Sequence, residues 1–290
     1  MALPLNIERI VIAGVGLVGG SVGLALKKTG FQGKIIGLGR RWSSLKRAID
    51  AGAVDSVEMD FAEALKEADI LLISTPVDTI SRMVGEAVKY VPKGCIITDV
   101  GSTKADLICE IEKLIPDGVY FVGGHPMAGS HKTGVESADA DLFKGTLCIL
   151  TPTESTKAEA LDLISNLWRI IGASVEVMSP DEHDFLIAAA SHLPHTVACA
   201  LTQVVSNAKN VRGSAMDFAA TGFSDVTRIA AGSPEIWKGI LIQNAEMVVS
   251  MLDKMEAELS EFRAILTAKN EDMLMEKLIR AKQIRDSFKR

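Results

Sequence analysis

Histidine side chains are the strongest candidates for proton transfer in this chain, and one of the five has a distinctive setting. His125 lies in the segment Gly123-Gly-His-Pro-Met-Ala-Gly129, directly after a short apolar run that predicts a strand. Open α/β sheets place reacting groups at the carboxyl ends of their strands. An imidazole with a pKa of about 6.5 accepts protons at cellular pH. The pattern indicates a general base, with a hydrogen-bonded structural histidine as the alternative.

A glycine-rich loop near the N-terminus has the spacing of a dinucleotide-binding turn. The pattern G-x-G-x-x-G follows a predicted strand and opens a predicted helix over 17–28. Its glycines permit a tight turn and close approach of a pyrophosphate, and the helix N-terminus favours the anion. A turn that binds nothing is the alternative. The residues expected to bind the cofactor are Gly14, Gly16, Leu17, Val18 and Gly19.

The residues after the second predicted strand favour NADP over NAD. An acidic side chain would hold the ribose hydroxyl of NAD at this place, but the chain has Gly39 followed by Arg40 and Arg41. A guanidinium group pairs well with a phosphate dianion. We therefore expect NADP, while the alternative is that both arginines only solvate a loop.

Short apolar runs alternate with helical patterns through the first part of the chain, as in βαβ units. A capping box at Ser179-Pro-Asp-Glu182 then begins a region with helical periodicity only. The predicted fold class is α/β: a Rossmann-type doubly wound parallel sheet, followed by an all-helical second domain. We place a dinucleotide-binding domain at 1–178 and a helical substrate and dimerisation domain at 179–290. The predicted strands are 9–13, 34–37, 70–74, 95–99, 120–122, 147–150 and 174–178.

Length, composition and charge limit the classes of molecule that this chain could bind. The 290 residues suit two domains, and 19 of the 24 glycines lie in the first 150 residues. A net charge of −6 with few aromatic residues argues against nucleic acid. The uncharged stretch 10–26 contains five glycines and is short for a membrane span. Four cysteines without metal-ligand spacing predict reduced thiols, no metal and a cytoplasmic location. A small-molecule substrate is the expected partner.

Several motifs together resemble the prephenate/arogenate dehydrogenase family, in the family's order and over nearly the whole chain. The resemblance implies an NAD(P)-dependent oxidoreductase of tyrosine biosynthesis. The implied reaction is oxidative decarboxylation of prephenate to 4-hydroxyphenylpyruvate, or of arogenate to tyrosine. The motifs are the glycine loop 14–21, Ala68-Asp-Ile-Leu-Leu-Ile-Ser-Thr-Pro-Val77, Thr98-Asp-Val-Gly-Ser-Thr-Lys104, His125-Pro-Met-Ala-Gly129, Asp141-Leu-Phe143, Ser191-His-Leu-Pro-His195 and Phe223-Ser-Asp-Val-Thr-Arg-Ile-Ala230.

The resemblance also implies roles for single residues. His125 would accept the hydrogen bond of the substrate hydroxyl, and Ser102 would orient its imidazole; Ser102 is also a candidate helix N-cap. Arg228 would bind a substrate carboxylate, unless it pairs locally with Asp225. The other implied contacts are His195 for the substrate, and Thr75 and Pro76 for the cofactor. His183 and His192 are expected to be structural, and family members form homodimers through the second domain.

One departure bears on the substrate. The family commonly continues its His-Pro-Met-Ala-Gly motif with Thr-Glu, whereas this chain has Ser130 and His131. A carboxylate there would favour the ammonium group of arogenate, and an imidazole would not. We therefore expect prephenate as the substrate, with Ser130 and His131 among its contacts.

Two other functions compete with this interpretation. A β-hydroxyacid dehydrogenase shares the domain order but uses a catalytic lysine in a second-domain helix. A non-catalytic NADP-binding regulator would need the glycine loop only. Because the chain ends soon after its helices, we expect no further regulatory domain, so that any control by tyrosine would act within the two domains.

Overall fold

The computed structural model describes residues 7–129 and 133–288. Two compact units divide the chain, the first ending at Asn244 and the second beginning at Ala245. The first unit therefore holds the sheet and also the helices up to Gln243, beyond the boundary that we predicted at 178. After residue 178 the chain changes from alternating strands and helices to helices. A domain boundary at this point stays a prediction.

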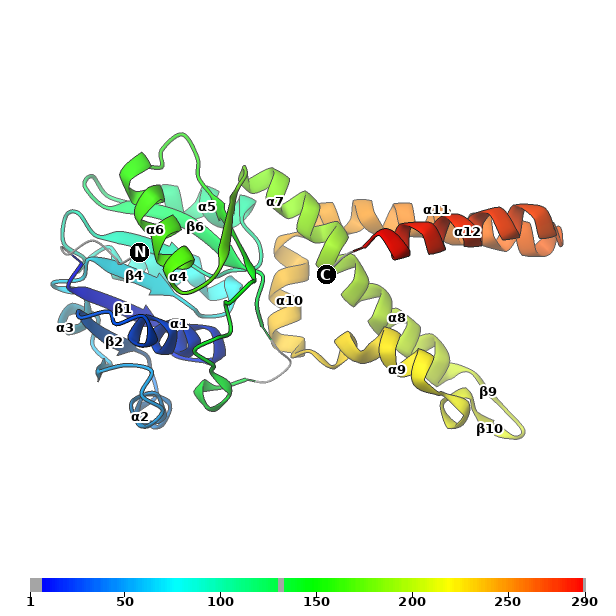
Figure 1. Ribbon diagram of the computed structural model, residues 1–290, viewed down its shortest axis with the longest axis horizontal. Helices are drawn as coiled ribbons and strands as arrows, with labels where there is room; N and C mark the ends of the chain where they lie inside the picture. The colour runs from blue at the N-terminus through cyan, green and yellow to red at the C-terminus, as the bar shows by residue number, and fades with distance from the viewer. Residues whose placement is uncertain (1–6, 130–132, 289–290) are drawn as a thin grey trace. The chain divides into compact units, whose positions relative to one another are not determined.

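The first unit is built on an eight-stranded sheet with the order β3-β2-β1-β4-β5-β6-β7-β8 (Figure 1). From β1 the chain adds two strands on one side and then crosses to β4 on the other, so a topological switch point lies between β1 and β4. The strands are β1 (Arg9–Ala13), β2 (Lys34–Leu38), β3 (Ser56–Glu58), β4 (Ile70–Ile73), β5 (Ile96–Asp99), β6 (Tyr120–Pro126), β7 (Leu147–Thr151) and β8 (Ser174–Val177).

Helices cover both faces of the sheet, which confirms the Rossmann-type doubly wound fold. The predicted helix over 17–28 is α1, with the same bounds. The helices of the first unit are α1 (Leu17–Lys28), α2 (Trp42–Asp50), α3 (Phe61–Leu65), α4 (Val77–Ala87), α5 (Ala105–Glu112), α6 (Ala158–Ile170), α7 (Pro180–Ile187), α8 (Leu193–Asn207), α9 (Thr221–Thr227) and α10 (Pro234–Gln243).

The sheet departs from the sequence prediction in two places. The short edge strand β3 was missed, because its three half-buried residues form no apolar run. Strand β7 runs antiparallel to β6. The described residues between them, 127–129 and 133–146, contain only the 3₁₀ turn η1 (Val135–Ser137) and no crossover α-helix. Pairing with β7 also extends β6 as far as Pro126, so that His125 lies within the strand rather than after it.

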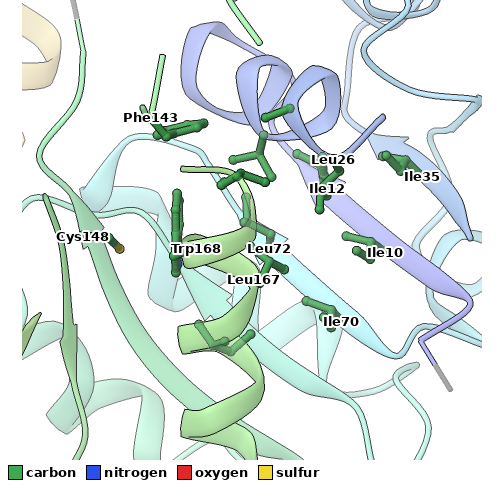
Figure 2. Packing of buried hydrophobic residues seen from close by; sticks show 14 of the residues in the cluster. Ile10, Ile12, Leu26, Ile35, Ile70, Leu72, Phe143, Cys148, Leu167 and Trp168 are labelled. Atoms are coloured by element: carbon green, nitrogen blue, oxygen red, sulfur yellow. The ribbon is translucent and has the colours of Figure 1, made fainter. Parts of the chain in front are cut away.

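Alternate residues of the central strands enter two separate cores. Ile10 and Ile12 of β1 pack on one face with α1 and α6, as Figure 2 shows. Val11 and Ala13 of the same strand point into the other core, which α3, α4 and α5 cover. Ile240 of α10 joins this second core. Burial on both faces explains why these strands read as unbroken apolar runs.

The helical region begins as predicted, at a capping box in which Ser179 and Glu182 bond each other's backbone. Five residues in π-helical geometry, η2 (Ala188–His192), connect α7 with α8. The continuous helix over 180–207 is long and apolar enough for a membrane span by length and composition alone, but it carries buried Asp184 and His183. One small exception to an all-helical region is a hairpin of β9 (Lys209–Asn210) and β10 (Gly213–Ser214).

The second unit is a pair of helices, α11 (Ala245–Thr267) and α12 (Glu271–Ser287). The chain reverses at Lys269, whose φ is 52°, and α12 folds back along α11 (Figure 1). Lys277 of α12 bonds Glu261 and lies 2.9 Å from Glu258 of α11. The helical periodicity predicted for this region does not show the break between α10 and α11, which the structure places at Asn244.

Candidate active site

A cavity of about 680 Å³ opens at the switch point between β1 and β4. The loops that follow these two strands line it, together with the residues after β2. Six residues predicted to bind the cofactor line this cavity: Gly14, Gly16, Arg40, Arg41, Thr75 and Pro76. Gly39, where an acidic residue would favour NAD, lines it as well.

The glycine loop has the geometry that a pyrophosphate requires. Gly14 has a φ of 92°, and a Cβ there would lie 2.6 Å from the carbonyl oxygen of Ser74. A Cβ on Gly16 would meet nothing within 4 Å, so open space for a ligand adjoins this backbone. Gly19 instead packs closely against Gly14. Together with Leu17 and Val18, it begins α1 without lining the cavity.

Positive charge gathers at the end of the cavity near β2. Exposed Arg40 and Arg41 line it, and so do Arg47 of α2 and Arg82 of α4, which the sequence did not single out. A Cβ on Gly39 would lie 3.1 Å from the Leu45 side chain, leaving little room for an acidic residue at this position. Glu86 lines the same cavity, and Arg47 also pairs with Glu136, so Arg40, Arg41 and Arg82 are the lining cations without an ion pair in the described residues.

His125 lies in a buried chain of hydrogen bonds. Its Nδ1 is 2.8 Å from Nε2 of His183, and Nδ1 of His183 is 2.8 Å from Oδ1 of Asp184. His183 is completely buried, while His125 is 8% exposed. Because Nδ1 is engaged, Nε2 is the nitrogen with which His125 would meet a substrate.

A buried ion pair holds the backbone beside His125. Lys104 Nζ bonds Oδ2 of Asp99, and both side chains are fully buried. Oδ2 also accepts from the backbone of Gly101 at 2.7 Å, and Oδ1 accepts from the backbone of Gly124 at 3.1 Å. One carboxylate thus connects the end of β5 to the residue before His125.

Ser102 lies half-buried in the loop between β5 and α5. It is not the N-cap of α5: the helix begins at Ala105, and the N-cap is Lys104. The carboxylate of Asp184 accepts hydrogen bonds from the backbone amides of Lys104 at 2.9 Å and Ala105 at 2.8 Å. A side chain from α7 thus caps the N-terminus of α5.

The helical region contributes a second group of histidines. His195 stacks on Trp237, with 3.5 Å between ring centroids, and bonds the backbone of Ile229, the residue after Arg228. Arg228 is exposed at the start of η4 (Arg228–Ala231), and in the described part of the chain it forms no ion pair with Asp225. Ser130 and His131 lie outside the described residues.

Burial sets the charge of these imidazoles. It lowers the pKa of His125 well below its usual value, and the charges of His183 and Lys104 act in the same direction. Burial likewise lowers the pKa of His192 to about 4 and that of His195 below its usual value. The rings are therefore neutral at cellular pH and can accept hydrogen bonds.

Four residues of this network have no functional role predicted from the sequence: Asp99, Lys104, Asp184 and His183, the last of which is expected only to be structural. Asp99 and Lys104 lie in a motif that we quoted, but only the fold shows that they pair in the interior. His183 and Asp184 are adjacent at a helix start, where polar residues are common for local reasons. The sequence has no signal that brings α7 beside β6.

Two family models match the chain almost end to end. The one described as "Prephenate dehydrogenase, nucleotide-binding domain" matches residues 22–177, and the one described as "Prephenate dehydrogenase, dimerization domain" matches residues 179–280.

Two dehydrogenases and one crystal structure are similar to this chain over nearly its whole length. Prephenate dehydrogenase of Bacillus subtilis is 36% identical over 97% of this chain and 76% of its own length. Cyclohexadienyl dehydrogenase of Zymomonas mobilis is 32% identical over 97% and 96%. The crystal structure of Aquifex aeolicus prephenate dehydrogenase with hydroxyphenyl propionate and NAD⁺ superposes with a TM-score of 0.92. It is 33% identical and covers 97% of this chain and 98% of that one.

We expect Lys104→Met to destabilise the protein strongly, because the Asp99 carboxylate would remain buried without its cation. Breaking a buried pair typically costs about 3–5 kcal/mol. Urea denaturation would measure the free energy of unfolding. The control is Lys89→Met, which removes an exposed pair with Glu86 and should cost less than about 1 kcal/mol. Equal effects of the two substitutions would contradict a structural role for the buried pair.

Proposed function

This chain belongs to the prephenate dehydrogenase family, and we propose that it oxidatively decarboxylates prephenate to 4-hydroxyphenylpyruvate, a step of tyrosine biosynthesis. The observation that carries the proposal is a buried, neutral His125 in a protein that matches this family over both of its parts. Family membership removes the reason to retain a β-hydroxyacid dehydrogenase. The alternative that remains is an arogenate or dual cyclohexadienyl dehydrogenase, as one relative's name indicates.

His125 is the proposed hydrogen-bond acceptor for the ring hydroxyl of the substrate. Accepting this bond raises the electron density on the carbon that loses hydride, and the loss of CO₂ then yields an aromatic ring. The bound nicotinamide supplies the hydride acceptor. Ser102, at the end of β5, is proposed to orient the imidazole.

The remaining substrate contacts are proposed for the helical region. Arg228 supplies a guanidinium for a carboxylate, and it lies next to the residue that bonds His195. His195 is held flat against Trp237, and its Nδ1 is buried without a partner in the described residues. His195 is the second proposed substrate contact of this region. Ser130 and His131 are proposed to contact the substrate side chain.

NADP is the proposed cofactor in preference to NAD. The glycine loop, with Leu17, Val18 and Gly19 opening α1, would hold the pyrophosphate, and Thr75 and Pro76 would line the opposite wall. The Aquifex enzyme was crystallised with NAD⁺, so the preference of this chain depends on its own residues around Gly39. Arg40 and Arg41 would take the additional phosphate.

We also propose that residues 1–178 and 179–290 act as dinucleotide-binding and substrate domains, that the chain forms a homodimer through the helical part, and that it is cytoplasmic. A match to a dimerization domain over 179–280 supports the dimer.

His125→Asn should lower kcat for prephenate by about 10²- to 10⁴-fold, the usual contribution of a positioned base. Steady-state rates with NADP would measure the loss, and unchanged cofactor affinity would show that the cavity is intact. A variant with near-normal kcat would contradict the assignment, whereas cofactor binding without turnover in the unchanged chain would favour a regulator.

The pH dependence should have its acidic limb below the usual histidine range. Burial, His183, Lys104 and His192 lower the pKa of His125, while the anions Asp99 and Asp184 also face this network. Because the neutral ring is the active form, kcat/KM should stay level from about pH 8 to below about pH 6.5 and fall only as the pH passes the lowered pKa. An acidic limb at about pH 6.5 would count against a buried base.

Arg40→Ala should raise KM for NADP by about 10- to 100-fold and change KM for NAD little, because a charge-assisted hydrogen bond contributes about 1.5–3 kcal/mol. Lys46→Ala is the matched control: Lys46 is an exposed cation of α2 that does not line the cavity. If Arg40→Ala keeps the original NADP preference, the assignment is wrong.

A kinetic panel of prephenate and arogenate against NAD and NADP tests the substrate. We expect kcat/KM to favour prephenate by about tenfold, corresponding to one unfavourable ammonium–imidazole contact. His131→Glu should shift the ratio toward arogenate. Equal or faster turnover of arogenate by the unchanged chain would overturn the proposed substrate.

A further inference from the structure

Three buried side chains form a hydrogen-bonded series that ends at the proposed acceptor. The carboxylate of Asp184 contacts His183, and His183 contacts His125, each at 2.8 Å. His183 and Asp184 are neighbours in the first half of α7, whereas His125 comes from β6. Only His125 has a role in the proposed reaction. In the described part of the chain, no hydrogen bond joins Asp184 or His183 to the proposed cofactor residues or to a proposed substrate residue other than His125.

The donors around Asp184 fix the direction of the first bond. Its Oδ1 accepts from the Lys104 amide at 2.9 Å, and its Oδ2 accepts from the Ala105 amide at 2.8 Å. With an amide donor facing each oxygen, this carboxylate acts as an acceptor at both. Nδ1 of His183 must therefore carry the proton and donate it to Asp184.

The second bond follows from the first. In the neutral form of His183, a proton on Nδ1 leaves a lone pair on Nε2. Nε2 of His183 faces Nδ1 of His125, so His125 is the donor in this contact. In neutral His125 the proton then lies on Nδ1, and Nε2 is left as an acceptor.

We propose that Asp184 and His183 are positioning residues that fix His125 in the tautomer whose Nε2 accepts the hydrogen bond of the substrate hydroxyl. The importance of this tautomer rests on the function proposed above, because a ring with its proton on Nε2 would present a donor to a group that must donate. The wrong tautomer at a catalytic histidine typically costs about 10⁴-fold in kcat.

The same carboxylate also fixes where the ring lies. By capping α5, Asp184 joins α7 to the segment that carries Lys104, and Lys104 pairs with Asp99. Asp99 in turn bonds the backbone of Gly124, one residue before His125. The acceptor is thus held through its ring from α7 and through its backbone from β5.

The tautomer can be observed without turnover. Two-bond ¹H–¹⁵N correlation spectra of the full-length chain with ¹⁵N-labelled histidine distinguish protonated from unprotonated ring nitrogens, and His125→Asn identifies the His125 signals. At about pH 7.5, where neutral rings prevail, we expect a protonated Nδ1 and an unprotonated Nε2. A protonated Nε2 would overturn the proposal. The test holds whichever substrate the enzyme uses, so it is independent of the proposed function.

A matched pair of substitutions tests the effect on rate. His183→Gln keeps a carbonyl oxygen that can accept from Nδ1, and it should keep both the tautomer and a kcat within about tenfold of the unchanged chain. His183→Leu removes the acceptor, so we expect mixed tautomers in the spectrum and a kcat lower by about 10²- to 10⁴-fold, with KM for NADP unchanged. An unaltered tautomer and rate in His183→Leu would overturn the proposal. If that variant does not fold, the spectrum of the unchanged chain still tests the proposal, because it shows which ring nitrogen of His125 carries the proton.

Discussion

The buried ion pair between Lys104 and Asp99 is the constraint on which the rest of the site depends. Two charges without solvent contact are tolerated only when further donors satisfy the carboxylate, and the amides of Gly101 and Gly124 supply them. These bonds join the ends of two adjacent strands. Burial is the main reason that the pKa of His125 is lowered, and the Lys104 cation acts in the same direction. The pair therefore stabilises the local backbone and also helps to keep the proposed acceptor neutral.

The elements around the cofactor cavity could be predicted because their signals are local. The glycines, the first strand and the first helix follow one another within twenty residues, and the helix has the predicted bounds. Strand β3 and the reversed direction of β7 could not be predicted in this way. The first has no apolar run, and the second depends on a connection whose path shows no periodicity.

The histidine network shows the same limit at the level of side chains. His125 was found from its motif, but His183 was expected to be structural, since nothing near it in sequence indicates a partner 58 residues away. Asp184 could be interpreted only as a helix-start residue, and it does cap a helix, although a different one from its own. For Ser102 the local pattern is misleading: its sequence position suggests the N-cap of α5, but in the structure the Asp184 carboxylate binds the amides at the start of that helix.

The π-helical turn between α7 and α8 decides which way the later histidines face. His183 and His195 are 12 residues apart, and in a regular α-helix, at about 100° per residue, they would project roughly 120° away from each other. A π turn accommodates one extra residue and so removes about 100° of that rotation. About 20° then remains between the directions of the two side chains, so His183 and His195 project from nearly the same side of the continuous helix over 180–207. A chain that lost one residue from 188–192 could form a regular α-helix and still keep His183 and His195 within about 20° of each other. Regular α-helical bonding without such a loss would separate the two side chains by about 120°, so the π turn offsets one extra residue in this helix.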